Sequence, residues 1–558
     1  MTGMLSGYQK QWLRADALAG VTTAAVVVPK SMAYASIAGL PVQAGLYVAL
    51  VPMLVYAMLG SSRLLSVSST STLAILTAAE LTLIVPGDDP VALMAAASAL
   101  ALLVGGILAA SGLLRLGFLA NFISDPVLTG FKAGVGLVIV VDQVPKLLGV
   151  HIGRGDFLRQ VLSILQHVPE TSLATLILAL ATLSLLVGIE HFRPKVPAPL
   201  LAVVFGVAAA AFLGLRESGV ALTGPIPARI PTPSLPNLSL LSSLWPGALG
   251  IALMSFTESI AAGRAFARHD DPSPAPNREL IALGAANLVG SLFQCFPAGG
   301  GTSQTAVNSR AGARTQAAAL VTVAMAAATL LFLSPLISLL PQATLAAVVV
   351  VTTAPLLSTK DFRSILLVRR AEFLWALAAC AGVIILGTLN GVLVAIAISV
   401  LTLIYQANHP LVYTLRRKPG TDVFRPHSQV HPEDETITDL LIIKTEGRMT
   451  FASAPQVRER VAALIDEAHP QVVILDCSAI PDFEYTALRT LIRAEERMRE
   501  GGISLWLSAL NPQALEVVRR SPLGQALGPQ RMFLNLADAV KAYETGSNAM
   551  RRSQASGH

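Results

Sequence analysis

The sequence predicts an all-α polytopic membrane protein of about 14 segments, followed by a small cytoplasmic α/β domain. Of its 558 residues, 53% are hydrophobic and only 13% are charged, whereas a soluble protein carries about 25% charged residues. The apolar stretches fill residues 1–410, and charged residues crowd the chain from about Arg416. So low a charge excludes a soluble enzyme, a disordered chain and a disulfide-rich secreted domain.

The membrane segments follow from hydropathy, because crossing the hydrocarbon takes about 20 apolar residues. The first apolar segment runs from Leu18 through Leu40 and is too long for a cleavable signal peptide. Short segments are expected to be re-entrant or broken helices. The candidate spans are 17–39, 44–60, 66–85, 91–114, 122–144, 172–190, 197–214, 246–264, 280–296, 301–312, 315–338, 343–358, 372–388 and 390–408.

Basic residues fall mainly in alternate loops. If every segment crosses, one side receives most of them, from Lys10 to Lys418. The opposite side receives only Lys146, Arg154, Arg159, Arg216 and Arg229. Because cytoplasmic loops are enriched in Lys and Arg, we expect an even number of crossings, with both termini in the cytoplasm, in the cell (inner) membrane.

The chain divides into domains near His409. We expect a transmembrane domain at 1–410, a linker at 411–436, an α/β domain at 437–545 and a polar tail at 546–558. In the α/β domain, short strand-like runs alternate with helical stretches, which predicts a small layered fold.

Two segments, 66–76 and 299–308, are rich in small and hydroxyl residues. We expect two repeats, repeat one at about 10–215 and repeat two at about 245–410. Each of the two segments is then the third segment of its repeat. Paired interrupted segments are typical of the midplane site of inverted-repeat transporters. Close helix packing explains such runs equally well. The run Gly299–Gly301 also predicts a helix opening inside the membrane, with its positive end facing an anion.

Ionisable residues inside the spans are the best functional candidates, because a charge there costs roughly 2.5–3.5 kcal/mol or more. Glu258 is expected to take a proton, hold a sodium ion, pair with a cation, or bond a neighbouring helix. Lys30 follows Pro29 and favours an anionic ligand or a structural pair with Glu258. Lys132 fits either a function or a structural role, and Asp142 lies too near a span end to rank with them.

Charge balance and cysteines add exclusions. The 40 Lys and Arg against 34 Asp and Glu give a net charge of +6, which basic cytoplasmic loops explain without nucleic acid. Cys295, Cys380 and Cys477 indicate buried thiols. We expect no metal and no cofactor other than a coupling ion.

Several stretches resemble one known family. They are PKSMAYASIAGLPVQAGLY at 29–47, SDPVLTGFKAGVGLVIV at 124–140, TESIAAGRAFARHDD at 257–271, NRELIALGAANLVGSLFQCFP at 277–297 and GGGTSQTAVNSRAGARTQ at 299–316. In these the chain resembles the SulP sulfate-permease family, bacterial relatives of prestin and pendrin. The tail resembles a STAS domain, with LDCSAIPDFEYTALRTL at 475–491 as its core.

The resemblance implies 14 segments in a seven-plus-seven inverted repeat, an elevator-type motion of a core domain against a gate domain, and a cytoplasmic STAS domain, commonly in a homodimer. Anions would bind between the broken third and tenth segments, and Glu258 would couple transport to H⁺ or Na⁺. The implied anion contacts are Lys30, Tyr34, Ser69, Gly301, Thr302, Ser303 and Gln304.

Two positions depart from the family pattern. Lys30 stands where many relatives have Gln, and Gln304 where many have Arg. We hypothesise that the site keeps one positive charge and carries it on the first segment. Lysine lacks the planar fork of arginine, so recognition of an oxyanion would be less strict in geometry.

Thr486 matches the phospho-acceptor position of soluble STAS regulators, but Ala487 replaces the usual glycine. The alternative is a purely structural helix start. A cytoplasmic partner of the STAS domain is a further expectation.

We therefore predict a secondary active transporter of an inorganic anion, with sulfate preferred, rather than an enzyme. Bicarbonate or a dicarboxylate is an alternative substrate, and a passive anion channel or uncoupled exchanger is an alternative mechanism. A membrane-anchored sensor is disfavoured by the intact site-like segments. The absence of a Gly-x-x-x-x-Gly-Lys motif disfavours an ATP-driven pump.

Overall fold

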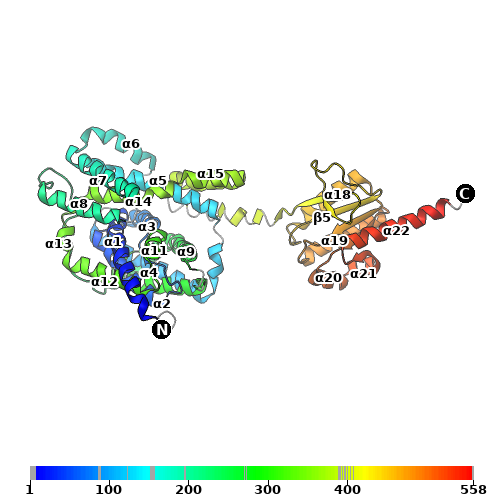
Figure 1. Ribbon diagram of the computed structural model, residues 1–558, viewed down its shortest axis with the longest axis horizontal. Coiled ribbons are helices and arrows are strands. Elements are labelled where there is room, and N and C mark those ends of the chain that lie inside the picture. The colour runs from blue at the N-terminus through cyan, green and yellow to red at the C-terminus, as the bar shows by residue number, and fades with distance from the viewer. Residues whose placement is uncertain are drawn as a thin grey trace. The chain divides into compact units, whose positions relative to one another are not determined.

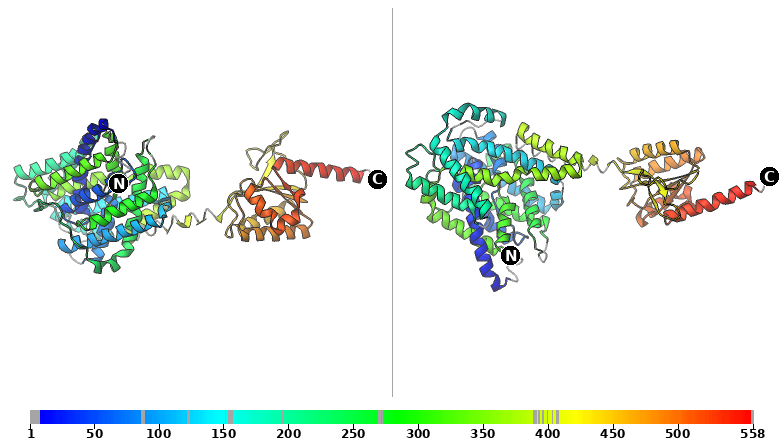
Figure 2. Two further views of the ribbon diagram at one scale, coloured as in Figure 1. Left: turned by 90° about the horizontal axis from the view of Figure 1, so that it is seen from below. Right: turned by 45° about the horizontal axis from the view of Figure 1, so that its top comes forward.

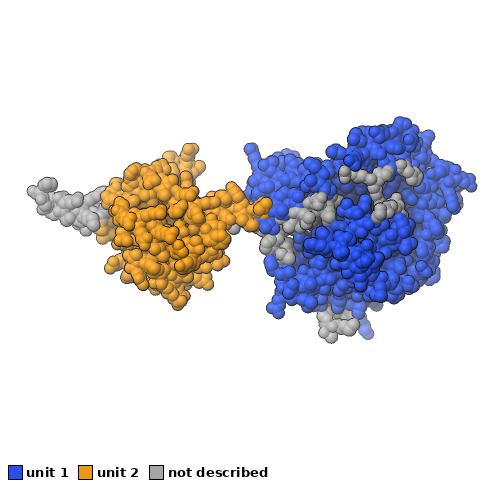
Figure 3. Space-filling model, turned by 180° about the vertical axis from the view of Figure 1, so that it is seen from behind, with its two compact units in different colours: residues 1–400 blue, residues 401–558 orange. Residues whose placement is uncertain are grey.

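The computed structural model divides into two compact units, residues 1–400 and 401–558, which Figure 3 colours blue and orange. The structure describes residues 8–85, 89–121, 124–150, 152, 157–193, 196–268, 271, 273–387, 391, 394, 397, 398, 400–402, 404, 405 and 408–555.

The first unit is helical, and its helices follow the predicted spans closely. Those of the first half are α1 (Leu13–Ile37), α2 (Val42–Leu59), α3 (Ser71–Ile84), α4 (Pro90–Leu113), α5 (Asp125–Leu148), α7 (Leu173–Phe192) and α8 (Ala198–Phe212). Those of the second are α9 (Leu241–Ala265), α10 (Pro276–Ser291), α11 (Thr302–Arg310), α12 (Ala317–Phe332), α14 (Gln342–Thr353) and α16 (Arg370–Leu386). The predicted segment 390–408 lies largely outside the described residues.

Within the described residues, seven helical stretches are long and apolar enough to cross a membrane. They are Lys10–Ile37, α2, α4, α5, α7, Leu238–Ala265 and Gln342–Val368, whereas α3, α8 and α12 are shorter apolar helices. This order of helices fits the predicted seven-plus-seven arrangement.

Shorter helices connect the spans. They are α6 (Phe157–His167), α13 (Ser334–Ile337), α15 (Thr359–Val368) and the 3-10 turns Lys10–Trp12, Leu116–Asn121, Val168–Glu170, Leu238–Leu240 and Ala354–Leu357. Local sequence explains several helix starts. Thr70, Asp89 and Ser172 accept hydrogen bonds from the first backbone N–H groups of α3, α4 and α7.

The helices of the first unit form two groups. α1, α2, α3 and α4 pack with α9, α10, α11 and α12, whereas α5 and α7 pack with α14, and α5 also packs with α16. α1 links the groups through α8 and α14. In Figure 1, α3, α9 and α11 lie in the interior of this unit. Each group combines helices from both halves, as expected for intertwined repeats.

The second unit is an α/β domain around a six-stranded sheet of order β4-β3-β5-β6-β7-β8. Its strands are β3 (Val412–Arg417), β4 (Phe424–Pro426), β5 (Leu440–Thr445), β6 (Val472–Asp476), β7 (Ser504–Ser508) and β8 (Met532–Phe533). β5 to β8 run parallel, and β3 is antiparallel to both β4 and β5. The predicted α/β class of this domain is confirmed.

Helices cover both faces of this sheet. One face packs on α18 (Ala454–Ala468), α19 (Tyr485–Glu500), α20 (Pro512–Arg519) and α21 (Pro522–Leu527), the last followed by a 3-10 turn at Pro529–Arg531. The other face packs on the start of α22 (Leu536–Ala555) through Ala539 and Val540. Figure 2 shows α22, in red, beginning against the sheet and extending beyond it.

Two boundaries differ from the prediction. The expected linker 411–436 contains β3 and β4, and β3 pairs with β5 inside the domain. The expected polar tail 546–558 is helical as far as Ala555. Charged residues surround the short runs of β3 and β4, so hydropathy concealed both strands, although Leu415 is buried in the sheet.

Candidate functional site at the broken helices

Two broken segments meet inside the first unit. β1 (Val67–Ser68) pairs antiparallel with β2 (Gly299–Gly300), and α3 and α11 begin shortly after these strands. The interruptions predicted at 66–76 and 299–308 are therefore confirmed. The first N–H groups of a helix lack partners within it and carry the positive end of its dipole. The starts of α3 and α11, which lie beside the β1–β2 pair, therefore form an environment that favours an anion.

The glycines of β2 let α9 pack directly on the strand. A Cβ atom on Gly299 would lie 2.9 Å from Ser255 Oγ, and one on Gly300 would lie 2.9 Å from Ser259 Cα. Ser259 Oγ accepts from the Gly300 N–H at 2.7 Å, and Ser255 Oγ donates to the Ala298 carbonyl at 2.8 Å. α9 thereby satisfies unwound backbone groups that the bilayer cannot hydrogen-bond.

Lys30 reaches this ladder from α1. Its side chain is buried, with the residue only 8% exposed, and its Nζ donates to Ser303 Oγ at 2.6 Å. Pro29, inside α1, removes one N–H from the helix beside it. The structure thus places an ammonium group at the first turn of α11, where a cation and unpaired N–H groups converge.

The first turn of α11 is open on one side. Thr302 and Ser303 are exposed, whereas the flanking Gly301 and Gln304 are buried. Gly301 is the N-cap of α11, and its N–H donates to the Ser66 carbonyl at 3.1 Å. Two of the four predicted contacts on this segment therefore face open space, and Gly301 holds the turn in place.

Tyr34 and Ser69 lie on the two neighbouring segments. Tyr34 is buried, and its side chain interacts with Ser71 of α3 and Thr352 of α14. Ser69 is fully buried, and its hydroxyl has no hydrogen-bond partner in the described part of the chain. The same holds for Ser31, next to Lys30, which the sequence analysis did not single out. Since buried hydroxyls are normally paired, these two are exceptions within the described residues.

Gln304 hydrogen-bonds the broken third segment. Its Oε1 accepts from Ser68 Oγ at 2.7 Å and Ser66 Oγ at 3.3 Å, and its Nε2 donates to the Ser69 carbonyl at 2.8 Å. The side chain thus fastens α11 to the broken third segment. Its amide makes these three hydrogen bonds, and the second N–H of Nε2 has no partner among the described residues.

Glu258 lies on α9 and is buried. Its Oε1 accepts from Thr72 Oγ1 at 2.7 Å and its Oε2 from Thr70 Oγ1 at 3.2 Å. The carboxyl therefore bonds the first turn of α3. Among the described residues no ion pair joins Glu258 to Lys30 within 4.0 Å, so the alternative of a structural pair between them is not what the structure shows.

Lys132 is partly buried on α5. Within the described ranges, no hydrogen bond or ion pair joins it to α3 or α11. Thr486 is exposed in the first turn of α19, and its carbonyl accepts from Thr490 Oγ1 at 3.0 Å. That position is compatible with both alternatives for Thr486.

The sequence analysis did not single out the buried carboxylates of Glu279 and Asp16. Glu279 of α10 is fully buried and accepts from Tyr56 Oη at 2.7 Å and the Ser61 N–H at 2.7 Å. Asp16 of α1 accepts from the Arg314 N–H at 2.6 Å and Thr315 Oγ1 at 2.7 Å. Both lie near span ends and hold connecting loops, where sequence alone cannot tell a buried carboxylate from an exposed one.

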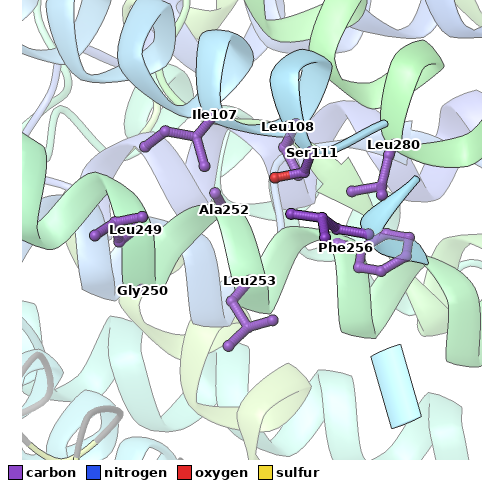
Figure 4. Close-up of a pocket in the computed structure, with 10 residues that line it drawn as sticks. Ile107, Leu108, Ser111, Leu249, Gly250, Ala252, Leu253, Phe256 and Leu280 are labelled. Atoms are coloured by element: carbon purple, nitrogen blue, oxygen red, sulfur yellow. The ribbon is translucent and has the colours of Figure 1, made fainter. Parts of the chain in front are cut away.

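An apolar cavity of about 200 Å³ lies apart from this site, between α4, α9 and α10. In Figure 4, the hydroxyl of Ser111 is the one side-chain oxygen among its labelled residues. Such a lining does not suit an anion. No group of three or more His, Cys, Asp and Glu side chains that could hold a metal is found among the residues the structure describes.

Comparison with known proteins agrees with this geometry. The sequence matches the sulfate permease family over residues 13–379 and the STAS domain over 431–539. It is 34% identical over 540 residues to a Mycobacterium tuberculosis H37Rv protein described as a probable sulfate transporter, covering 96% of each chain. It is 30% identical to probable sulfate transporter 3.3 of Arabidopsis thaliana, covering 96% of this chain and 88% of the relative.

Solved structures share the fold at lower identity. A structure of SLC26A9 matches with a TM-score of 0.88 at 22% identity, covering 98% of this chain and 93% of that one. The transmembrane domain of the cyanobacterial bicarbonate transporter BicA matches with a TM-score of 0.59 at 24% identity, covering 70% of this chain and 98% of that one. The chain belongs to the sulfate permease family of multi-pass membrane anion transporters and carries a STAS domain at residues 431–539.

Proposed function

We propose that this anion transporter carries sulfate, bound between the first turns of α3 and α11. The observation that carries the proposal is the Lys30 ammonium at 2.6 Å from Ser303 Oγ. A tetrahedral dianion accepts hydrogen bonds in several directions at once. The flexible ammonium, the unpaired N–H groups of α11 and the hydroxyl of Ser69 supply donors of that kind. The two relatives described as sulfate transporters support this choice.

Bicarbonate is the second candidate. The site has one buried cation, Lys30, because Gln304 stands where an arginine is common and its amide is bonded elsewhere. One positive charge balances a monoanion more completely than a dianion. Dicarboxylates are larger candidate substrates, and the uptake experiment below tests them together with sulfate and bicarbonate.

We propose an elevator-type mechanism, in which the group built from α1–α4 and α9–α12 moves against the group built from α5, α7, α14 and α16. The site lies within the first group, since α1, α3, α9 and α11 all belong to it. α1 also contacts α14 of the second group. Motion of the first group would carry the bound anion with it.

Coupling is proposed at Glu258, by H⁺ or Na⁺. Its two oxygens face the hydroxyls of Thr70 and Thr72 at the start of α3. A cation held there would sit beside the anion site and compensate its charge. The uncoupled alternative, a passive channel or exchanger, has no need for this carboxyl. If Glu258→Gln uptake still follows the cation gradient, coupling lies elsewhere.

We further propose that the protein lies in the cell (inner) membrane as a homodimer, with both termini in the cytoplasm, and that it uses no cofactor beyond the coupling ion. Regulation through the STAS domain is proposed to occur by a cytoplasmic partner or by phosphorylation of Thr486. The basic loops motivate the orientation.

The experiment for this function is uptake by the purified full chain in liposomes. Labelled sulfate, bicarbonate and a dicarboxylate are supplied under separate proton and sodium gradients. We expect concentrative sulfate uptake under one gradient. Equal uptake of all anions without any gradient would favour the passive channel instead.

A further inference from the structure

A second carboxyl of the broken third segment has no role in the site described above. Glu80 lies in the second half of α3, and the residue is 3% exposed. Among the described residues no hydrogen bond or ion pair reaches its side chain. Thr77, one turn earlier on the same helix, is fully buried, and its hydroxyl is also without a partner. Two neighbouring unpaired polar groups are unusual in a protein interior.

The fold makes room for this carboxyl at α9. A Cβ atom on Gly247 would lie 1.5 Å from Glu80 Oε1 and 2.0 Å from its Cδ. The Glu80 side chain therefore occupies the space that any other residue at 247 would fill. Gly247 gives the carboxyl a defined place against the α9 backbone.

The surroundings offer no charge to balance an ionised Glu80. α3 packs mainly on α1, α4, α5 and α9, and α4 contains no titratable residue. None of the charged or titratable groups on the other three helices, nor the carboxyl at the α4 cap, hydrogen-bonds or ion-pairs with Glu80 among the described residues. These groups are Arg14, Asp16, Lys30, Tyr34, Asp89, Asp125, Lys132, Asp142, Lys146, Glu258 and Arg264.

Two physical effects then favour the neutral carboxyl. A buried carboxylate without a partner loses its hydration and gains nothing in return. The position of Glu80 in the second half of α3 also keeps it away from the positive end of the helix dipole, which stabilises carboxylates. Glu258 differs on both counts, because two hydroxyls donate to it at the N-terminal end of the same helix.

Charge on Glu80 acts on the anion at the other end of α3. Ser71 and Glu80 are nine positions apart on α3, which corresponds to about 14 Å along the helix. At that distance an ionised Glu80 would weaken binding about sevenfold for each negative charge on the anion, if the effective dielectric constant is about 20. Binding of a proton and binding of the anion therefore favour each other.

We propose that Glu80 is a proton-binding site of the transport cycle, distinct from Glu258, and that its protonation strengthens anion binding between α3 and α11. This inference rests on the anion site proposed above. The exchange is a simple proton transfer: the Glu80 carboxylate gains H⁺ from water when the anion binds and returns it when the anion leaves.

The test uses the full chain and the conservative variant Glu80→Gln, which keeps the shape of the neutral carboxyl. Sulfate affinity is measured from pH 6 to pH 9, and proton uptake on sulfate addition is followed with a pH dye in weak buffer. We expect wild-type affinity to fall several-fold with rising pH while protons are taken up. In Glu80→Gln both responses should be clearly smaller than in the wild type, because Glu80 no longer contributes to them.

Thr77→Val is the matched control, because it removes the unpartnered hydroxyl of the same face without removing a titratable group. It should keep the pH dependence, as should Glu258→Gln if the two carboxyls act separately. A Glu80→Gln protein with the wild-type pH profile and proton uptake would overturn the inference. Loss of sulfate binding by the wild type at every pH would instead overturn the proposed function.

Discussion

The Nζ atom of Lys30 donates to Ser303 Oγ at 2.6 Å, which joins two residues 273 positions apart in the sequence. One belongs to the proline-containing first helix, and the other to the first turn of the broken tenth segment. This contact brings the one ammonium group of the site to the positive end of α11. In the proposed anion site, Lys30 therefore supplies the positive charge that position 304 lacks.

Substitution of Ser69 is expected to weaken sulfate binding without lowering the stability of the fold. Its buried hydroxyl is unpaired, so Ser69→Ala should leave the unfolding temperature unchanged and weaken sulfate binding by roughly two- to tenfold, the worth of one hydrogen bond. Ser68→Ala is the matched control, because Ser68 Oγ donates to Gln304 Oε1 at 2.7 Å. We expect that variant to lower stability, measured by thermal unfolding. The reverse pattern would mean that Ser69 does not face the anion.

The relocated positive charge predicts a rescue. Lys30→Gln removes the ammonium, and adding Gln304→Arg supplies a guanidinium at the position where relatives have one. The double variant should transport sulfate better than Lys30→Gln alone, although replacing Gln304 removes its three hydrogen bonds to the third segment. Uptake in liposomes measures this. If the double variant is no better than Lys30→Gln, the charge has not been relocated.

The close approach of α9 to β2 predicts a steric effect. A Cβ on Gly300 would lie 2.8 Å from Leu65 Cδ1 and 2.9 Å from the Ser259 backbone, so Gly300→Ala should cost about 1–3 kcal/mol of stability and reduce uptake. Gly188→Ala on α7 is the control, since nothing lies within 4 Å of its Cβ. Thermal unfolding of the two variants gives the comparison. Equal stability would contradict the observed packing.

The STAS domain predicts an acid-sensitive contact. Arg425 donates to both oxygens of Asp434, at 2.8 and 2.7 Å, and this hydrogen bonding lowers the pKa of the Asp434 carboxyl. A lowered pKa contributes stability above the unfolded value of about 3.9, and that stability is lost as the pH falls through the folded value. Asp434→Asn should therefore loosen β3 and β4 at pH 7.

Hydrogen exchange of the β3 and β4 backbone, compared with wild type at matched pH, measures this loosening. The difference between variant and wild type should begin to shrink as the pH falls below about 3.9, the unfolded value, and should vanish only below the lowered folded pKa, where the wild-type carboxyl is protonated. A difference that stays constant with pH would show that the ion pair is not its source.

Much of the first unit follows from sequence, because hydropathy and the bilayer thickness restrict helices directly. The break at Gly299–Gly301 was also predictable, because three successive glycines disfavour a continuous helix in the middle of a membrane span. The broken segment near Ser69 was predictable only through its pairing with that run.

The direction of individual side chains was not predictable. Gln304 faces the third segment instead of open space because three hydrogen-bonding groups there satisfy its amide. Glu80 lies inside the predicted span 66–85, so the rule that selected Glu258 applies to it as well, but its packing against Gly247, 167 positions away in sequence, is visible only in the structure. The strands β3 and β4 escaped because their pairing with β5 and with each other, and not local hydropathy, makes them part of the sheet.

The most direct measurement is equilibrium binding of sulfate to the purified full chain by titration calorimetry, comparing wild type, Lys30→Gln and Lys132→Gln. Lys30→Gln should weaken binding roughly 10- to 100-fold, the worth of one hydrogen bond to a charged group. Lys132→Gln, which removes the other lysine of the predicted spans, should bind as wild type does. Equal affinity of wild type and Lys30→Gln would contradict an anion site at the start of α11.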